Sequence, residues 1–129
     1  MAFAALEQSI EHVGTAIIGA AIEVHRQLGP GFLERIYQEA LCLELHARGI
    51  NFERERSVLV MYRGVGIPGQ RIDLVVENCV IVELKAARGI DPSIEAKVIS
   101  YLRSTGIRLG YILNFNATTM KAGVQRIVV

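Results

Sequence analysis

Three charged residues interrupt two apolar runs in the segment RIDLVVENCVIVELKA, residues 71–86. Asp73 lies within the first run, and Glu83 and Lys85 lie at the end of the second. Charged side chains in the strands of a sheet interior are costly unless they are paired, solvated or bound to an ion. The spacing D-x9-E-x-K therefore points either to a chemical site or to ion pairs at the end of a sheet.

The register of the predicted hairpin decides whether the two carboxylates meet. A two-residue turn would place Asp73 opposite Val82, whereas a three-residue turn over 77–79 places it opposite Glu83. Three-residue turns commonly hold one residue in the left-handed region, a conformation that Asn78 tolerates. We expect the longer turn, which puts the two carboxylates side by side.

Two carboxylates on directly paired strand positions have β-carbons roughly 5 Å apart and destabilise the sheet by repulsion. A hard divalent cation between them reverses the sign of that interaction, because it prefers oxygen ligands. Lys85 shares a strand face with Glu83 and can steady a phosphate or a hydroxide there. The alternative interpretation is an exposed Asp–Glu–Lys ion-pair cluster, which contributes little to stability.

Hydrophobic periodicity outlines the elements that position these residues. Helices are predicted over 6–28, 32–48 and 93–104, and strands over 55–62, 70–76, 79–85, 108–115 and 124–129. Gly49 is expected just after the second helix, and Asp91 or Ser93 is expected to cap the third. The order ααβββαββ predicts an α+β or mixed α/β fold, in which the third helix is a crossover and the strand after it can run parallel to 79–85.

Length and composition predict one domain over 1–129 with a substantial core. The net charge of +1 excludes a histone-like polyanion binder, although a local basic patch is compatible with it. Cys42 and Cys79 are not in metal-binding or redox spacing, and no signal peptide is recognisable, so we expect reduced thiols and a cytoplasmic protein. The longest apolar stretch, 14–22, is too short to span a membrane.

The pattern D-x9-E-x-K on a hairpin resembles the PD-(D/E)XK nuclease superfamily, with Ile72 in place of the proline. The segment GFLERIY, residues 31–37, fits the pattern G-x-x-E-x-x-Y. Together with YLRSTG, GYILNFN and KAGVQRI further along, it makes nearly the whole chain similar to the small bacterial GxxExxY proteins. This resemblance implies a restriction-endonuclease-like core preceded by two helices.

The resemblance also implies roles for individual residues. Asp73, Glu83 and the main-chain carbonyl of Leu84 would hold Mg²⁺ or Mn²⁺, and Lys85 would orient the attacking water and stabilise charge on the phosphate. Glu34 matches an acidic residue that superfamily members supply from the preceding helix, and it would ligate the metal directly or through water.

Three further residues are candidate substrate contacts. Tyr37 lies one turn after Glu34, and the sequence does not distinguish packing from contact there. Superfamily relatives carry Gln-x-x-x-Tyr on the helix after the lysine strand, where this chain has Lys97 and Tyr101. A lysine at this position can hold a phosphate, or it can occupy the place of the metal and weaken metal binding.

Three functions follow as hypotheses. The first is a metal-dependent phosphodiesterase acting on DNA or RNA. The second is a non-catalytic nuclease-fold module that binds nucleic acid or a partner protein. The third is a homo-oligomeric scaffold, such as a homodimer, with the first helix and the strand at 124–129 as contact surfaces.

Overall fold

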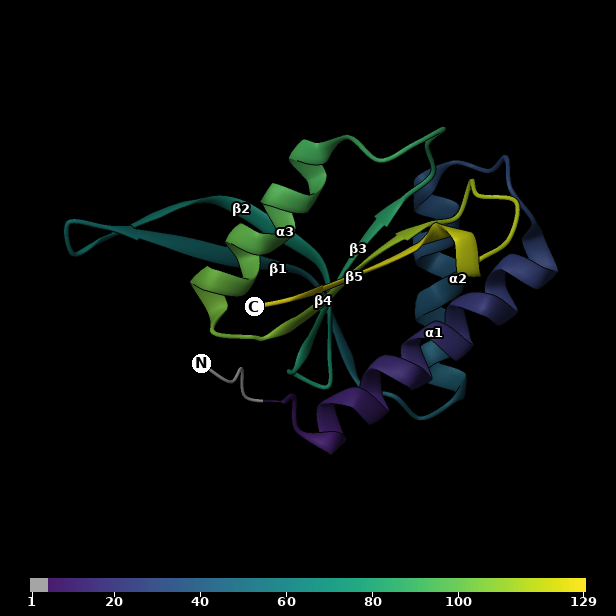
Figure 1. The fold of residues 1–129 in the computed structure, drawn as a ribbon, viewed down its shortest axis with the longest axis horizontal. Coiled ribbons are helices and arrows are strands. Elements are labelled where there is room, and N and C mark those ends of the chain that lie inside the picture. The colour runs from purple at the N-terminus through teal and green to yellow at the C-terminus, as the bar shows by residue number, and fades with distance from the viewer. Residues whose placement is uncertain (1–4) are drawn as a thin grey trace.

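A computed structural model describes residues 5–129 as a mixed five-stranded sheet packed between helices (Figure 1). The elements are α1 (Gln8–Leu28), α2 (Glu34–Ala47), β1 (Phe52–Tyr62), β2 (Val65–Val76), β3 (Val80–Lys85), α3 (Pro92–Thr105), β4 (Leu109–Asn114), a short 3₁₀ helix η1 (Lys121–Gly123) and β5 (Val124–Val128). The predicted order ααβββαββ and the mixed α/β class are confirmed.

The strands lie in the order β1-β2-β3-β4-β5. β3 and β4 are parallel, and every other neighbouring pair is antiparallel. The predicted parallel pairing of the strand after the third helix with 79–85 is therefore confirmed. A parallel pair needs a crossover connection, which α3 provides.

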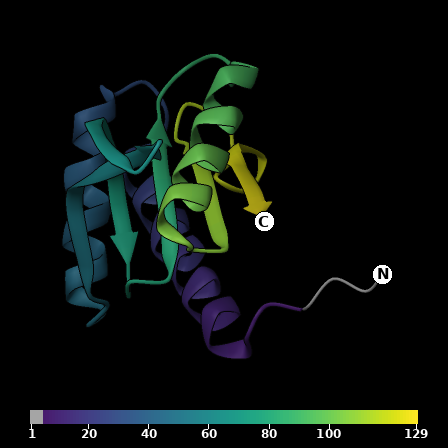
Figure 2. The same ribbon diagram turned by 90° about the vertical axis from the view of Figure 1, so that its left-hand side faces the viewer.

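Helices cover both faces of the sheet: Figure 2 views the strands broadly face-on, with α3 in front of them and α1 behind. α1 and α2 bury Ile17, Ala20, Val24, Tyr37, Leu41 and Leu45 against strand residues such as Leu74, Val82, Leu84 and Leu113. α3 buries Val98, Tyr101 and Leu102 against Val75, Ile81 and Ile112 on the opposite face. Because both faces are buried, the central strands consist almost entirely of apolar residues.

Helix ends follow the predicted capping residues. The Asp91 side chain accepts a hydrogen bond of 2.8 Å from the backbone N–H of Ser93 at the start of α3. After α2, Gly49 adopts a left-handed φ of 71°, and the N–H of Ile50 donates to the carbonyl of Leu45 over 2.9 Å. This is the hydrogen bond of a Schellman motif, which glycine favours.

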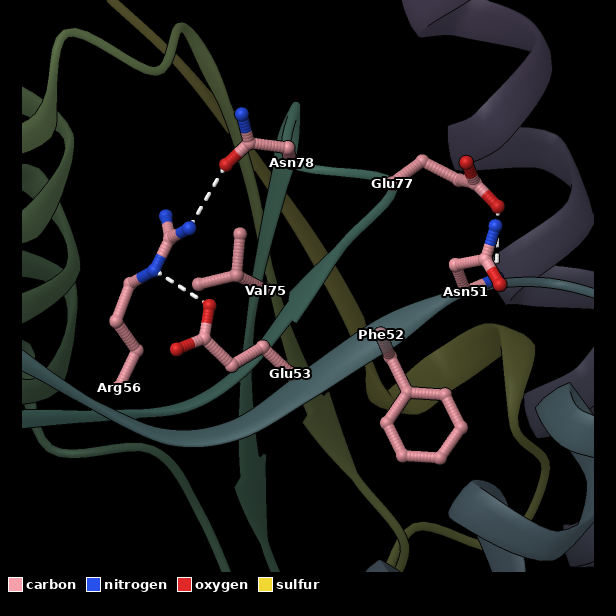
Figure 3. Close-up of a pocket in the computed structure, with 7 residues that line it drawn as sticks. All are labelled: Asn51, Phe52, Glu53, Arg56, Val75, Glu77 and Asn78. Carbon is pink, nitrogen blue, oxygen red and sulfur yellow. Dashed lines mark hydrogen bonds and ion pairs between the residues drawn. The ribbon is translucent and has the colours of Figure 1, made fainter.

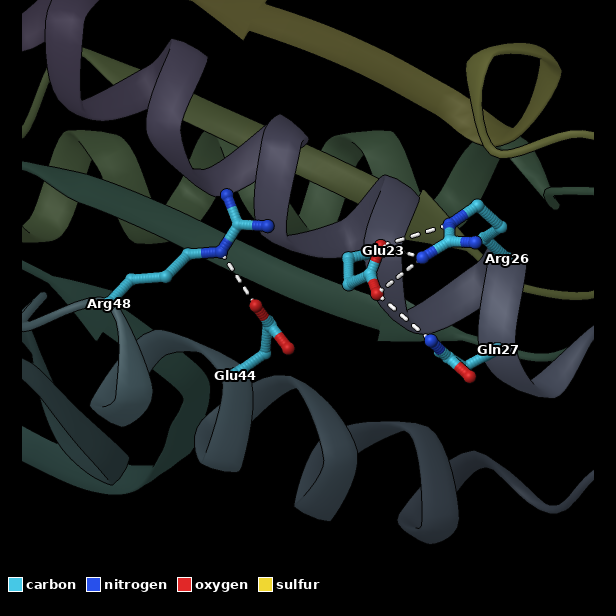
Figure 4. Close-up of polar contacts among 5 residues, drawn as sticks. All are labelled: Glu23, Arg26, Gln27, Glu44 and Arg48. Carbon is cyan, nitrogen blue, oxygen red and sulfur yellow. Dashed lines mark hydrogen bonds and ion pairs between the residues drawn. The ribbon is translucent and has the colours of Figure 1, made fainter.

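The outer surfaces of α1 and α2 carry ion pairs that are partly or fully exposed (Figure 4). Glu23 contacts Arg26 and Gln27 within α1, and Glu44 contacts Arg48 at the end of α2. Exposed pairs of this kind contribute at most about 1 kcal/mol each, so the fold rests on the buried apolar layers. Within 5–129, no helix combines the length and apolarity that crossing a membrane requires.

The first hairpin is longer than its sequence predicts. β2 begins at Val65 rather than at residue 70, so Gly66 lies inside the strand. The turn consists of Arg63 and Gly64, with φ angles of 51° and 79°. Two left-handed residues between paired strand ends are typical of a type I′ hairpin, whose twist matches that of the strands.

Candidate active site

The β2–β3 turn sets the register that brings the two carboxylates together. Val76 pairs with Val80 and Leu74 pairs with Val82, which leaves three residues, 77–79, in the turn. The prediction of a three-residue turn is confirmed. Continued by one residue, this register places Asp73 across from Glu83, on the strand position beyond the last regular pair.

Two turn residues adopt left-handed backbone angles. Asn78 has a φ of 55°, as its residue type led us to expect, but Glu77 has a φ of 49°, which its residue type does not predict. Glu77 is held there by Asn51, whose N–H donates to the Glu77 carboxylate over 2.7 Å and whose carbonyl accepts from the Glu77 N–H over 2.9 Å. Tertiary hydrogen bonds thus offset the local backbone strain.

A pocket of about 380 Å³ lies beside this turn (Figure 3). The basic residue among those that line it, Arg56, donates hydrogen bonds of 2.8 Å to the Glu53 carboxylate and to the side-chain oxygen of Asn78. Neither Asp73 nor Glu83 lines it. Since its charged groups bond within the protein, the pocket is not part of the candidate site.

β2 separates from β3 beyond Leu74, and Asp73 occupies the place where the strands part. The backbone N–H of Leu84 donates to Oδ2 of Asp73 over 3.0 Å. The Lys85 carbonyl points to the opposite side of β3, where it accepts a hydrogen bond of 2.9 Å from the N–H of Phe115, the residue after β4. Backbone groups alternate in direction along a strand, so the Leu84 carbonyl faces the β2 side, toward Asp73.

Glu83 is buried at the centre of the site, with 1% of its side chain exposed. Its Oε2 lies 3.4 Å from Nζ of Lys85 and 3.2 Å from Nζ of Lys97. Its Oε1 has no hydrogen-bond partner among residues 5–129. A buried carboxylate is costly unless it is fully paired, so this is not an exposed ion pair of the kind that the sequence left open.

The electrostatics of Asp73 reflect its crowded position. Burial and, after it, the charge of the Glu83 carboxylate raise the pKa of Asp73 to about 6, against the opposing effect of the hydrogen bond from the Leu84 N–H. Partial burial acts to lower the pKa of Lys97, but the Glu83 carboxylate and the Tyr101 hydroxyl outweigh it, so that pKa is raised. The Glu83 carboxylate thus disfavours the charged form of Asp73, and Lys97 is held in its cationic form.

Glu34 is the first residue of α2 and is exposed. Its charge contributes to the raised pKa of Asp73, so it lies within electrostatic range of the pair. Over residues 5–129, however, no three His, Cys, Asp or Glu side chains are grouped closely enough to hold a metal ion. The structure therefore brings Asp73 and Glu83 together and leaves Glu34 outside their immediate cluster.

One acidic neighbour was not predicted. The pairs Arg54–Leu74 and Arg56–Ile72 leave Glu55 beside Asp73, and Glu55 has a left-handed φ of 52°. Its charge also raises the pKa of Asp73. In the sequence, Glu55 is only one member of an alternating Glu–Arg run at 53–56, which does not distinguish it. Glu55 reaches the site because the β1–β2 ladder is interrupted there, and that interruption depends on how the two strands pair.

Tyr37 lies in the core. Its side chain has no exposed surface and stacks on Phe115 with ring centroids 4.8 Å apart. Its hydroxyl donates to the Gly29 carbonyl over 2.5 Å and accepts from the Phe32 N–H over 3.1 Å. The sequence left open whether Tyr37 packs in the core or contacts substrate, and in this structure it packs in the core.

Tyr101 and Lys97 lie on the face of α3 that covers the site. Nζ of Lys97 is 5.8 Å from the centroid of the Tyr101 ring, as their four-residue spacing leads one to expect. The Tyr101 hydroxyl donates to the Arg71 carbonyl over 2.8 Å. Tyr101 thus ties α3 to the strand that carries Asp73.

The donor set fits a hard divalent cation. Two carboxylates converge, one of their buried oxygens has no hydrogen-bond partner in the described part of the chain, and a backbone carbonyl faces the same side. Oxygen donors of this kind suit Mg²⁺ and Mn²⁺. Lys85 and Lys97 bring two positive charges to the same place, so any cation bound there must compete with them.

Comparison with known proteins supports the architecture. A family model of the PD-(D/E)XK nuclease superfamily matches residues 11–127. No curated protein and no solved structure matches the chain. The matched region begins in α1 and ends in β5, and so includes every strand and both carboxylates described above. The chain therefore belongs to the PD-(D/E)XK nuclease superfamily.

Proposed function

We propose that this protein is a Mg²⁺- or Mn²⁺-dependent nuclease that hydrolyses phosphodiester bonds at the site formed by Asp73, Glu83 and Lys85. The observation that carries the proposal is the placement of Asp73 beside the buried Glu83, where β2 leaves β3, with Nζ of Lys85 3.4 Å from Glu83. Superfamily membership supports the same chemistry.

Asp73, Glu83 and the Leu84 carbonyl would hold the cation in this proposal, and Glu34 would act on it through water. When bound, the cation supplies Lewis-acid polarisation of the phosphate and a water molecule of lowered pKa. Lys85 donates a hydrogen bond to the attacking water or to a non-bridging phosphate oxygen, where negative charge grows in the transition state. Glu83 positions Lys85 for this through their ion pair.

A second function is favoured by one observation. Nζ of Lys97 lies 3.2 Å from Oε2 of Glu83. The positive charges of Lys85 and Lys97 therefore balance the negative charges of the two carboxylates without any metal. This arrangement favours a non-catalytic module that binds nucleic acid or a partner protein through the same face. Metal binding separates the two functions, because only the nuclease requires it.

We also propose that the chain is a GxxExxY protein, since the three fixed positions of the motif, Gly31, Glu34 and Tyr37, each have a distinct task in the fold. Gly31 adopts a φ of 112°, which a residue with a side chain rarely adopts. Glu34 opens α2 on the side of Asp73, and Tyr37 holds the preceding loop through Gly29. The motif therefore fixes the conformation of the loop before α2 and, with it, the position of the Glu34 carboxylate.

Cleavage of labelled single- and double-stranded DNA and RNA, with Mg²⁺ or Mn²⁺ and with EDTA, tests the nuclease. We expect metal-dependent products from the wild type, and losses of about 100-fold or more for Asp73→Asn and Lys85→Ala. Glu95→Gln and Lys121→Ala are matched controls, because both residues are exposed and lie outside the site. Activity that survives both site substitutions would overturn the assignment.

Calorimetric titration with Mn²⁺, without nucleic acid, tests the alternative. A binding heat that disappears in Asp73→Asn supports the metal site and excludes the metal-free module. If the wild type binds no metal at millimolar concentration yet binds nucleic acid, the non-catalytic module replaces the nuclease.

A further inference from the structure

The outer part of the β1–β2 hairpin, residues 56–72, extends away from the remainder of the protein (Figure 1). We call it the arm. β2 pairs with β3 only from Leu74 to Val76, so the arm strands pair only with each other. The arm is therefore a two-stranded ribbon, and neither of its edges pairs with another strand within residues 5–129.

The base of the arm is covered and its tip is not. Val58 and Ile72 are buried beneath α3, in the core layer that includes Tyr101. Toward the tip, large apolar side chains are exposed, with Tyr62 at 67% and Met61 at 64%. The others are Leu59, Val60, Val65 and Ile67. A concentration of exposed apolar residues marks an interaction surface.

The charge of the arm identifies the kind of partner. Residues 56–72 include three arginines and no aspartate or glutamate, although the chain as a whole has a net charge of only +1. Arg56 is paired with Glu53, but Arg63 at the turn and Arg71 form no ion pair within the described residues 5–129. This charge complements a polyanion.

The position of the arm points to the substrate of the proposed site. Arg71 precedes Asp73 by two residues on the same strand, and its carbonyl is fixed by the Tyr101 hydroxyl. A phosphodiester held at Asp73 therefore has its flanking nucleotides alongside the arm.

The arm is poorly suited to pairing with a second copy of the chain. Pro68 lacks the backbone N–H that an added strand would need, and Gly69 has a φ of 131°. The β1–β2 ladder is irregular between Val58 and Val60. Proline and bulges are features by which natural edge strands resist strand addition.

We propose that the arm binds B-form duplex DNA next to the scissile phosphate. Arg63 and Arg71 contact backbone phosphates, and Met61 and Tyr62 pack against sugars and bases. The major groove of B-DNA admits a two-stranded ribbon, whereas that of A-form RNA is too deep and narrow for side chains to read. The proposal rests on the nuclease function proposed above and specifies its substrate class.

Fluorescence anisotropy with a labelled DNA duplex, measured in EDTA, separates binding from cleavage. The test variant is Tyr62→Ala/Arg63→Asn, in which asparagine tolerates the left-handed turn position. Leu43→Ala/Lys121→Ala is the matched control, because both residues are exposed and lie outside the arm. We expect roughly tenfold or greater loss of affinity for the test variant only, and a salt dependence weaker by about one phosphate contact.

Unchanged affinity in the arm variant overturns the proposal, and so does equal wild-type affinity for duplex RNA. Analytical sedimentation tests whether the arm instead binds a second copy of the chain. A dimeric wild type and a monomeric arm variant would assign the arm to self-association and overturn the proposal. Failure of the proposed nuclease function can be distinguished from failure of the arm proposal. If the wild type shows no metal-dependent cleavage but the arm variant loses duplex binding in EDTA, the arm's role stands and only catalysis is lost.

Discussion

Lys97 on α3 reaches across to Glu83 on β3, and its Nζ lies 3.2 Å from a carboxylate that is 1% exposed. Lys85 contacts the same oxygen over 3.4 Å. The Asp73–Glu83 pair is thus already matched by two ammonium groups before any metal binds. In the proposed metal site, Lys97 is therefore the residue of α3 that would compete with a cation for the Glu83 carboxylate.

Replacing Lys97 by glutamine is expected to strengthen metal binding. The substitution removes one competing charge and changes the formal charge of the four-residue cluster from neutral to −1. We expect Mn²⁺ to bind roughly tenfold more tightly, because Lys97 is partly exposed and water weakens its effect. Calorimetry without nucleic acid measures this. Lys121→Gln provides the control, and equal affinities for wild type and Lys97→Gln would show that Lys97 does not compete with the metal.

Asp73 should make the metal-free protein less stable as pH rises. Its folded-state pKa of about 6 exceeds the 3.8 of an ordinary aspartate, so the folded state binds the proton more tightly. The free energy of unfolding therefore falls from about pH 4 to about pH 6 and stays lower above that. Relative to Asp73→Asn, we expect the wild type to lose about 1–2 kcal/mol over this range, allowing for the partial exposure of Asp73.

Urea unfolding in EDTA, near pH 4 and near pH 7, measures that difference. Asparagine keeps the acceptor for the Leu84 N–H, so the variant removes the charge and retains the hydrogen bond. Glu95→Gln, on the exposed surface of α3, should follow the wild-type profile. Parallel profiles for wild type and Asp73→Asn would contradict the raised pKa of Asp73.

Glu34 is expected to support metal binding from outside the inner set of ligands. Because Glu34 is exposed and is not grouped with Asp73 and Glu83, Glu34→Gln should weaken Mn²⁺ binding roughly tenfold, whereas Asp73→Asn should abolish it. The two variants are compared in one calorimetric series. A complete loss of binding in Glu34→Gln would instead make Glu34 a direct ligand.

Tyr37→Phe is expected to affect stability and not chemistry. It leaves the Gly29 carbonyl and the Phe32 N–H without their shared partner, at a cost of about 1–3 kcal/mol in the free energy of unfolding. The cleavage rate per folded molecule should match the wild type. Full stability combined with lost cleavage would show that the Tyr37 hydroxyl acts on the substrate after all.

Much of the fold follows from local sequence signals. Helix and strand periodicity identify the elements, Asp91 and Gly49 mark helix ends, and the three-residue turn before Val80 sets the β2–β3 register. These features depend on neighbours in the chain, so residue type and spacing are sufficient to predict them. The same spacing led to the expectation that Asp73 meets Glu83.

The early start of β2 is not a local property. Pro68 and the glycines near it disfavour a strand, and only pairing with β1 overrides that preference. The left-handed angle of Glu77 likewise depends on Asn51, which is distant in sequence. Neither the length of the arm nor the backbone of the turn could therefore be predicted from residue types.

The sequence by itself determined the order of elements, the carboxylate pair and its lysine. Only the tertiary structure decided that Tyr37 is buried, that Glu55 adjoins Asp73, and that Lys97 contacts Glu83. The physical reason is that these contacts join elements whose relative positions arise from packing on the two faces of the sheet. Spacing along one helix or strand carries no information about which residue of another element lies opposite.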